Sequence, residues 1–464
     1  MKSVSDILTD LWVHVGGDPR SLAQVQLTGD EPGLPSSFRV GAVAQSTIAA
    51  VGLVAALRHE RRTGIPRTVS VGMDHAVAEF QSERFVSIDG QVTKGFRDPL
   101  AGVLPCRNGG WFRPHITFPH HKSRLAQLLG IPEDPDRATF AAAIKGWDAT
   151  ALEDAAMECG AVGAALRTFS EWDSLPQARA AAEAPILRIE RIGDAPRQDA
   201  APGSAQPLSQ IRVLDLTRVI AGPVCGRAFA AYGAQVLAIS SPRLPSIAQL
   251  VLDTNRGKFS ANLDLEVEED ASCLRELVGG ADIFLQSYRP ESLKRRGFGP
   301  EELAQIRPGI IYAQLSAYGR SGSWSERRGF DSLVQTAMGF NHAEMVAARS
   351  EHPQELPCQV LDHACGQLLA LGVMIALERR AAEGGSWLVE VSLATTGHWL
   401  RRLGRLETGL MTPYHAPDER FYTFQKSSDW GCLGGIRPAA HLSGVAVELT
   451  RATPRLGADR ARWL

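Results

Sequence analysis

The chain has 464 residues, which is too long for one hydrophobic core and predicts two or three domains with room for a cleft. Its 49 lysine and arginine residues nearly balance its 51 aspartate and glutamate residues, so no overall basic charge would attract nucleic acid or a membrane surface. A small-molecule partner is therefore favoured. Seven cysteines without a CxxC pair or regular spacing indicate reduced thiols, which favours the cytoplasm.

The first residues, MKSVSDILTDLW, lack the apolar core and cleavage site of a secretion signal, so we expect no leader to be removed. The long uncharged stretch 40–57 contains Gln45, Ser46 and Thr47, and it carries alanine and glycine where a membrane span would carry leucine. We therefore expect a buried helix there.

Residues 193–207 (GDAPRQDAAPGSAQP) have the composition of a linker, because they offer too little apolar surface to hold a structure. Beyond it, short apolar runs at 211–216, 233–239, 262–265, 282–286 and 309–315 alternate with helical patterns. This alternation predicts an α/β fold with a doubly wound parallel sheet. The loop after the first strand, 217–223, has no GxGxxG, which disfavours a plain NAD-dependent dehydrogenase.

An internal repeat links the two parts of the chain. Residues 40–73 align without a gap on residues 360–393 with nine identities, and both copies read as a small-residue helix, a charged turn with glycine, and a strand. Two alanine-rich helices could match by composition alone, but the turn glycines and the following strand favour duplication. The first copy has Ala42 at the position of Asp362.

Four segments in order carry a family resemblance: 213–236 (VLDLTRVIAGPVCGRAFAAYGAQV), 255–265 (NRGKFSANLDL), 287–299 (SYRPESLKRRGFG) and 315–331 (LSAYGRSGSWSERRGFD). Together they resemble the family III CoA-transferases, the group related to carnitine-CoA transferase, formyl-CoA transferase and alpha-methylacyl-CoA racemase. Asp362, followed by Gly366 and Gly372, matches the nucleophilic aspartate of that family. From the residues alone, a helix N-cap is the favoured interpretation of Asp362; the resemblance favours catalysis instead, and both roles are compatible.

The resemblance implies a CoA-binding α/β domain plus a smaller α+β domain. It also implies acyl-CoA and a carboxylic acid as substrates, no tightly bound cofactor or metal, and a homodimer. Residues 1–192 resemble only the later portion of the family, so the chain looks like a fused partial duplication: residues 1–192, a linker at 193–207, the CoA-binding part at 208–395 and a shortened segment at 396–464. We expect the first region to supply the small domain that the second copy lacks.

The implied chemistry is a CoA transfer in which the Asp362 carboxylate attacks the thioester and forms an aspartyl-CoA intermediate. We expect backbone N–H groups of residues 364–366 to stabilise the oxyanion. The resemblance places CoA contacts at eight positions, each of which could also be an ordinary surface residue: Arg218, Val219, Ala221, Lys258, Tyr288, Arg289, Arg295 and Tyr318.

Two alternatives stay open. A racemase or epimerase needs a second acid/base group, but the Gly-His-Asp triplet of the racemase branch reads Gly329-Phe330-Asp331 here. A CoA-binding pseudoenzyme would explain Ala42, as well as Ser240 in place of the usual acidic residue. The histidines of HITFPHH (115–121) have no cysteine partners and no HExxH pattern, so we interpret them as a surface loop.

Overall fold

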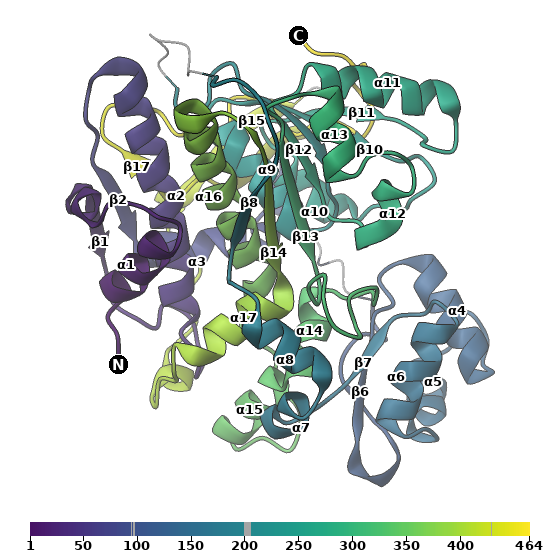
Figure 1. The fold of residues 1–464 in the computed structure, drawn as a ribbon. Coiled ribbons are helices and arrows are strands. Elements are labelled where there is room, and N and C mark those ends of the chain that lie inside the picture. The colour runs from purple at the N-terminus through teal and green to yellow at the C-terminus, as the bar shows by residue number, and fades with distance from the viewer. Residues whose placement is uncertain (94, 96–97, 199–205, 428) are drawn as a thin grey trace.

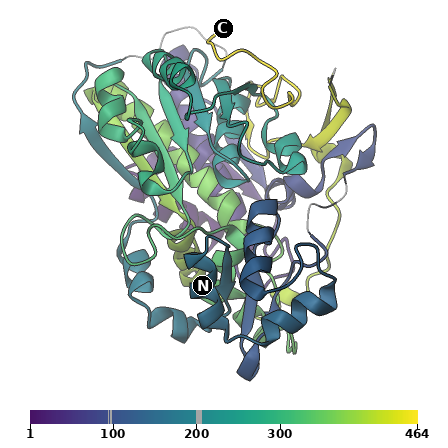
Figure 2. The same cartoon turned by 90° about the vertical axis from the view of Figure 1, so that its right-hand side faces the viewer.

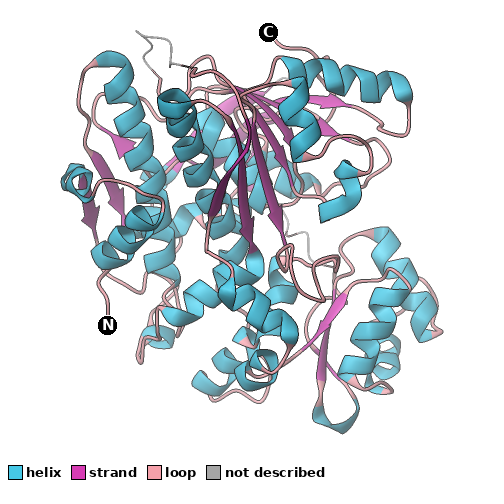
Figure 3. Ribbon diagram, in the orientation of Figure 1, coloured by secondary structure: helices cyan, strands magenta, loops and turns pink. Residues whose placement is uncertain are grey.

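The computed structural model describes all residues except 94, 96–97, 199–205 and 428. Its centre is a seven-stranded sheet in the order β11-β10-β9-β12-β13-β14-β8 (Figures 1 and 3). The strands are β8 (Arg188–Gly193), β9 (Arg212–Leu216), β10 (Gln235–Ser240), β11 (Phe259–Asn262), β12 (Ile283–Gln286), β13 (Ile311–Ser316) and β14 (Ser386–Ser392). All neighbours are parallel except β14 and β8.

Helices cover both faces of this sheet, because successive strand residues point to opposite sides. Val213 packs toward α9 (Ala221–Ala231) and α16 (Val360–Glu383), whereas Leu214 packs toward α11 (Glu268–Gly279), α12 (Pro290–Lys294) and α13 (Pro300–Ile306). The predicted α/β class with a doubly wound parallel sheet is therefore confirmed. The predicted strand 262–265 is wrong in its bounds, since β11 ends at Asn262 and the chain turns at Asp264.

The long helix of the repeat has the same bounds in both copies. Helix α2 (Val40–Thr63) and α16 are each 24 residues long and start 320 positions apart, and α3 (Met73–Glu79) and α17 (Leu393–Arg402) also start 320 positions apart. Strand β2 (Val69–Gly72) of the first copy corresponds to β14 of the second. Both long helices have the length and apolar composition of a membrane span, but 94% of each apolar window is buried inside the protein. The predicted buried helix is thus confirmed.

The two copies exchange strands. β8, from the end of the first region, pairs antiparallel with β14, while β17 (His441–Leu442), from the end of the chain, pairs antiparallel with β2. Strand β1 (Val25–Thr28) completes this second sheet in parallel with β2. Each copy therefore completes the sheet of the other. The homodimer implied by the resemblance stays a prediction.

A smaller α+β unit lies beyond the carboxyl ends of β12 and β13 (Figures 1 and 2). It has its own hydrophobic core. Its elements are β5 (Leu104–Pro105), β6 (Trp111–Pro114), α4 (Pro119–Leu129), α5 (Arg137–Lys145), α6 (Ala149–Glu158) and β7 (Gly163–Ala165). The predicted linker 193–207 includes 199–205, which fall outside the described residues, and the domain boundaries stay a prediction.

Candidate active site

A cleft of about 480 Å³ opens where the strand order of the central sheet reverses. Strands β9 and β12 are neighbours there, and the chain leaves them in opposite directions across the sheet. The loops that follow them, at 217–220 and 287–289, contribute Arg218, Val219 and Arg289 to the cleft wall. Ligands of doubly wound sheets bind in this crevice, and the volume falls in the range of small-molecule sites.

Asp362 lies in the first turn of α16 and lines this cleft with 8% of its surface exposed. Gln359, just before the helix, makes no side-chain cap. The carboxylate of Asp331, at the start of α14 (Asp331–Met338), caps the first turn instead. The Asp362 N–H donates to Asp331 Oδ2 at 2.9 Å. Asp362 is therefore not a cap, and its own carboxylate is left to face the cleft.

Burial and two neighbouring carboxylates act on the nucleophile candidate. Burial raises the pKa of Asp362 well above its ordinary range, and the charges of Asp331 and Glu83 raise it further. Burial also raises the pKa of Asp331 to about 6, although hydrogen bonds from Asp362 and Gln335 oppose this rise. The charge of Asp331 thus opposes ionisation of Asp362, and the protonation states of the two groups depend on each other.

Gly366, one turn after Asp362, allows α9 to approach α16 closely. A Cβ at Gly366 would lie 2.6 Å from the Ala221 carbonyl oxygen and 2.8 Å from Val224. This close contact places the loop that contains Val219 next to the first turn of α16. Val219 itself has a φ of 74°, which is strained for a β-branched residue and typical of functional loops.

The cleft wall is strongly basic. Among the described lining residues, six arginines face three carboxylates: Arg218, Arg243, Arg289, Arg296, Arg327 and Arg328 against Asp264, Glu266 and Asp362. Arg328 has no acidic partner among the described residues, and burial, together with Arg289 and Arg124, lowers its pKa. Arg243, Arg296 and Arg327 form ion pairs with Asp264, Glu266 and Asp154. Arg218, Arg289 and Arg328 have no acidic partner among the described residues, and such guanidinium groups suit the phosphates of a nucleotide.

The first region of the chain supplies one side of the cleft. Phe118, His120 and His121, at the start of α4, line it, and His121 is only 4% exposed. His115 stacks on Phe330 with ring centroids 3.6 Å apart. The interpretation of 115–121 as a surface loop is therefore wrong, because the small α+β unit folds these aromatic rings over the sheet. Among the described residues, no group of three His, Cys, Asp or Glu side chains could hold a metal ion.

Five of the eight predicted CoA contacts line the cleft together with Asp362: Arg218, Val219, Ala221, Tyr288 and Arg289. Arg295 lines an adjoining surface groove that shares Arg289. Tyr318 lines a second cavity, of about 570 Å³, which shares Tyr288 with the cleft. The roles of these seven residues stay predictions.

Lys258 is placed differently from its prediction. Its side chain is fully buried, with Nζ 2.8 Å from Asp215 Oδ2 and 2.9 Å from the Pro223 carbonyl oxygen. It therefore supports the start of α9 from below and is not available to a ligand. The oxyanion prediction is also wrong, because residues 364–366 lie beyond the first turn of α16, where N–H groups bond to carbonyls four residues earlier.

Comparison of the sequence with known proteins identifies a family and several relatives. Residues 20–204 and 208–417 match the family described as CoA-transferase family III. An acetyl-coenzyme A transferase of Hypoxylon pulicicidum is 36% identical over 232 residues, covering 48% of this chain and 39% of the relative. An acyl-CoA transferase of Gibberella moniliformis is 29% identical over 81% of this chain and 73% of the relative. An alpha-methylacyl-CoA racemase of Mus musculus is 29% identical over 52% of this chain and 65% of the relative.

Some of these matches cover only part of the relative. The match with a probable fatty acyl-CoA transferase of Mycobacterium tuberculosis is 33% identical and covers 41% of this chain and 51% of the relative. The chain thus spans about half or less of that relative and of the Hypoxylon enzyme. A crystal structure of a hypothetical protein from Mycobacterium tuberculosis aligns over 43% of this chain and 59% of that chain, with 32% identity and a TM-score of 0.39.

Proposed function

The chain belongs to CoA-transferase family III, and from this premise we propose that it is an acyl-CoA:carboxylate CoA-transferase with Asp362 as its nucleophile. The observation that carries the proposal is the position of Asp362. A buried carboxylate opens into a cleft whose other walls are rich in arginine. A carboxylate nucleophile and a phosphate-binding wall in one cleft are what a CoA thioester requires.

The reaction proceeds in four exchanges at carbonyl carbons. A carboxylate oxygen of Asp362 attacks the thioester carbonyl carbon, the C–S bond breaks, and a mixed anhydride and CoA thiolate form. The thiolate attacks the Asp362 carbonyl carbon, which releases the first carboxylic acid as its anion and leaves an aspartyl-CoA thioester. The incoming carboxylate displaces the thiolate to give a second anhydride. Attack of the thiolate on the new acyl carbon then forms the product and restores Asp362.

The cleft favours this exchange over hydrolysis. Aromatic rings of Phe118 and Phe330 close one side, with their centroids 6.0 Å apart, and the Arg218 guanidinium lies 5.4 Å from the Phe118 ring. Such walls exclude water from the anhydride while leaving cationic groups beside the thioester. The N–H groups at the start of α9, beside Asp362, replace residues 364–366 as candidates to stabilise the oxyanion.

A CoA-exchange assay tests the proposal. The protein is incubated with a panel of acyl-CoA donors and carboxylate acceptors, and new acyl-CoA is measured by chromatography. We expect turnover with at least one pair and loss of at least a thousandfold in Asp362→Asn. Full activity in that variant would end the proposal, and CoA binding without turnover across the panel would favour a pseudoenzyme.

A second candidate function is proton exchange at C2 of an acyl-CoA. It is favoured by His121, which lies in the wall of the same cleft, with its ring centroid 6.1 Å from that of Phe330. A second acid/base group in the same cleft as Asp362 could act on the opposite face of the carbon. Deuterium incorporation at C2 of a branched acyl-CoA, lost in His121→Phe, would support this reaction. Its absence in the wild-type protein would exclude it.

A further inference from the structure

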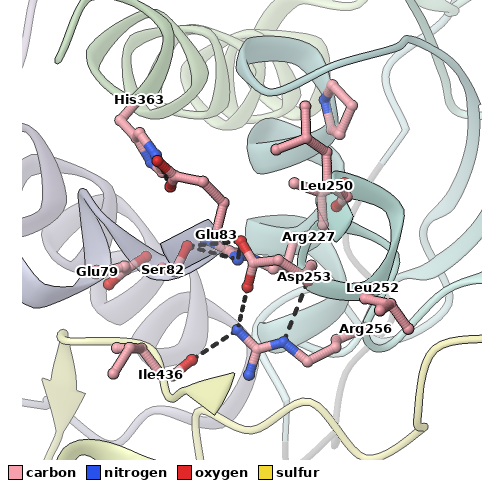
Figure 4. Close-up of polar contacts among 12 residues, drawn as sticks. Glu79, Ser82, Glu83, Arg227, Leu250, Leu252, Asp253, Arg256, His363 and Ile436 are labelled. Atoms are coloured by element: carbon pink, nitrogen blue, oxygen red, sulfur yellow. Dashed lines mark hydrogen bonds and ion pairs between the residues drawn. The ribbon is translucent and has the colours of Figure 1, made fainter. Parts of the chain in front are cut away.

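A buried polar cluster lies directly behind the first turn of α16 (Figure 4). It joins η2 (Ser82–Arg84) of the first region, helices α9 and α10 (Ala248–Thr254) beside the central sheet, and strand β16 (Gly431–Ile436). Asp253, fully buried at the end of α10, accepts hydrogen bonds from Ser82, Arg227 and Arg256. Arg256 also donates to the Ile436 carbonyl oxygen at 2.7 Å. These bonds hold η2 in place next to the first turn of α16.

Glu83 extends from this fixed turn to His363, the residue after Asp362. The distance from Glu83 Oε2 to His363 Nε2 is 3.0 Å, and the two side chains are 2% and 1% exposed. The ring of Phe80 stacks on the His363 imidazole at 5.3 Å. Glu83 is 280 positions from His363 in the sequence, so the first region contributes an acid to the catalytic helix of the second.

We propose that Glu83 is a positioning residue for the transfer reaction: through His363 it fixes the first turn of α16 and holds a negative charge behind Asp362. The inference rests on the function proposed above. Its physical basis is the change of charge during the reaction. Asp362 is an anion before attack and a neutral acyl group in both the anhydride and the aspartyl-CoA thioester. Nearby anions therefore destabilise the free nucleophile more than the covalent intermediates, and they favour bond formation.

Other charged groups face Asp362 from every side. Asp331 lies beneath it on α14, and His363 follows it on α16. Arg218, Arg327 and Arg328 line the same cleft. His121 is held neutral, since burial lowers its pKa to about 3. Asp331 and Glu83 are thus the groups that oppose ionisation of Asp362, and burial together with these charges raises its pKa.

The pH dependence of covalent adduct formation tests the role of Glu83. The full-length protein is incubated with acyl-CoA between pH 4 and 9, and the CoA adduct is measured by intact-protein mass spectrometry. In Glu83→Gln we expect the pH at which half of the maximal adduct forms to fall by about one pH unit. We also expect less adduct at high pH than in the wild-type protein. The two profiles should therefore cross, which a loss of folded protein alone would not produce.

Glu79→Gln is the matched control. Glu79 is a buried acid of the same cluster that accepts hydrogen bonds from Gln367 and the Ala439 N–H, but it makes no bond to His363. We expect this variant to keep the wild-type midpoint. An unchanged midpoint in Glu83→Gln, with only a lower plateau, would reduce Glu83 to a structural role.

The wild-type profile provides a test that does not depend on the folding of a variant. If Glu83 and Asp331 are negatively charged beside Asp362, the midpoint of adduct formation lies clearly above pH 4. A midpoint near 4 would overturn the inference while leaving the transferase proposal intact. By contrast, no adduct at any pH with any acyl-CoA would overturn the proposed function itself.

Discussion

Arg58 forms a buried ion pair with Glu378, which stands 320 positions later and is its own counterpart in the repeat. The distance from Arg58 Nη1 to Glu378 Oε1 is 2.6 Å. A residue that meets its counterpart lies near an axis of two-fold symmetry, as at the centre of a symmetric dimer. Together with the reciprocal pairing of β8 with β14 and of β17 with β2, this contact shows that one chain builds an arrangement usually made by two equivalent parts.

The pair predicts unequal effects on stability. Glu378→Gln leaves the Arg58 guanidinium, 3% exposed, without a carboxylate and next to Arg62, so we expect a loss of about 3 kcal/mol in the free energy of unfolding. Arg58→Met leaves Glu378 paired with Arg61 at 2.6 Å and should cost about 1 kcal/mol. Urea denaturation measures both values. A larger loss in Arg58→Met would contradict this account.

Gly366→Ala should damage both stability and activity. Its Cβ would press against the Ala221 carbonyl and move the loop at 217–221 away from Asp362, at a cost of about 1–3 kcal/mol. Gly279→Ala is the control, because a Cβ there meets nothing within 4 Å and a helix gains slightly from alanine. Transfer rates and thermal unfolding compare the two variants. Wild-type activity in Gly366→Ala would show that the close approach is not required.

Asp253 makes stability depend on acid pH. Its burial opposes its charge, but Arg227 and Arg256 outweigh burial and lower its pKa to about 2. Because this is below the unfolded value of 3.8, its contribution of about 2 kcal/mol is complete above pH 4 and lost as the pH falls through 2. The free energy of unfolding, followed by circular dichroism, should fall less steeply with decreasing pH in Asp253→Asn than in the wild-type protein. An identical slope would contradict the assignment.

Asp362→Asn should keep or increase stability. The folded protein raises the pKa of Asp362, so the unfolded chain releases that proton first and the native state loses stability as the pH rises above about 4. Asparagine removes this loss. We therefore expect a higher melting temperature than wild type at pH 7, with the difference vanishing near pH 4. A variant less stable than wild type at pH 7 would mean that the native state needs the charge.

The sequence allowed prediction of those parts of the site that depend on local motifs. Asp362 and Gly366 lie on one helix, and the loops after β9 and β12 follow from the rule that ligands bind where strand order reverses. The repeat was visible as a fixed offset, and the structure gives α2 and α16 matching bounds. Asp331 ends the family-like segment 315–331, but its bond to the Asp362 N–H depends on packing that this segment does not encode.

The remaining parts depend on contacts between distant segments. The sequence predicts Lys258 on a loop that faces the ligand. In the structure its ammonium group is buried and donates a hydrogen bond to Asp215, 43 residues earlier. His121 and Glu83 reach the site only because the first region folds against the second, and no spacing in the sequence signals this. Such placements follow from tertiary packing, which outweighs local pattern.

Peptide mapping of the CoA adduct tests the central claim most directly. The protein is incubated with acyl-CoA, treated with borohydride or hydroxylamine, digested and analysed by mass spectrometry. We predict modification of the Asp362 side chain, absent in Asp362→Asn and absent without acyl-CoA. Modification at a different residue, or an adduct that persists in Asp362→Asn, would contradict the assignment of Asp362 as the nucleophile.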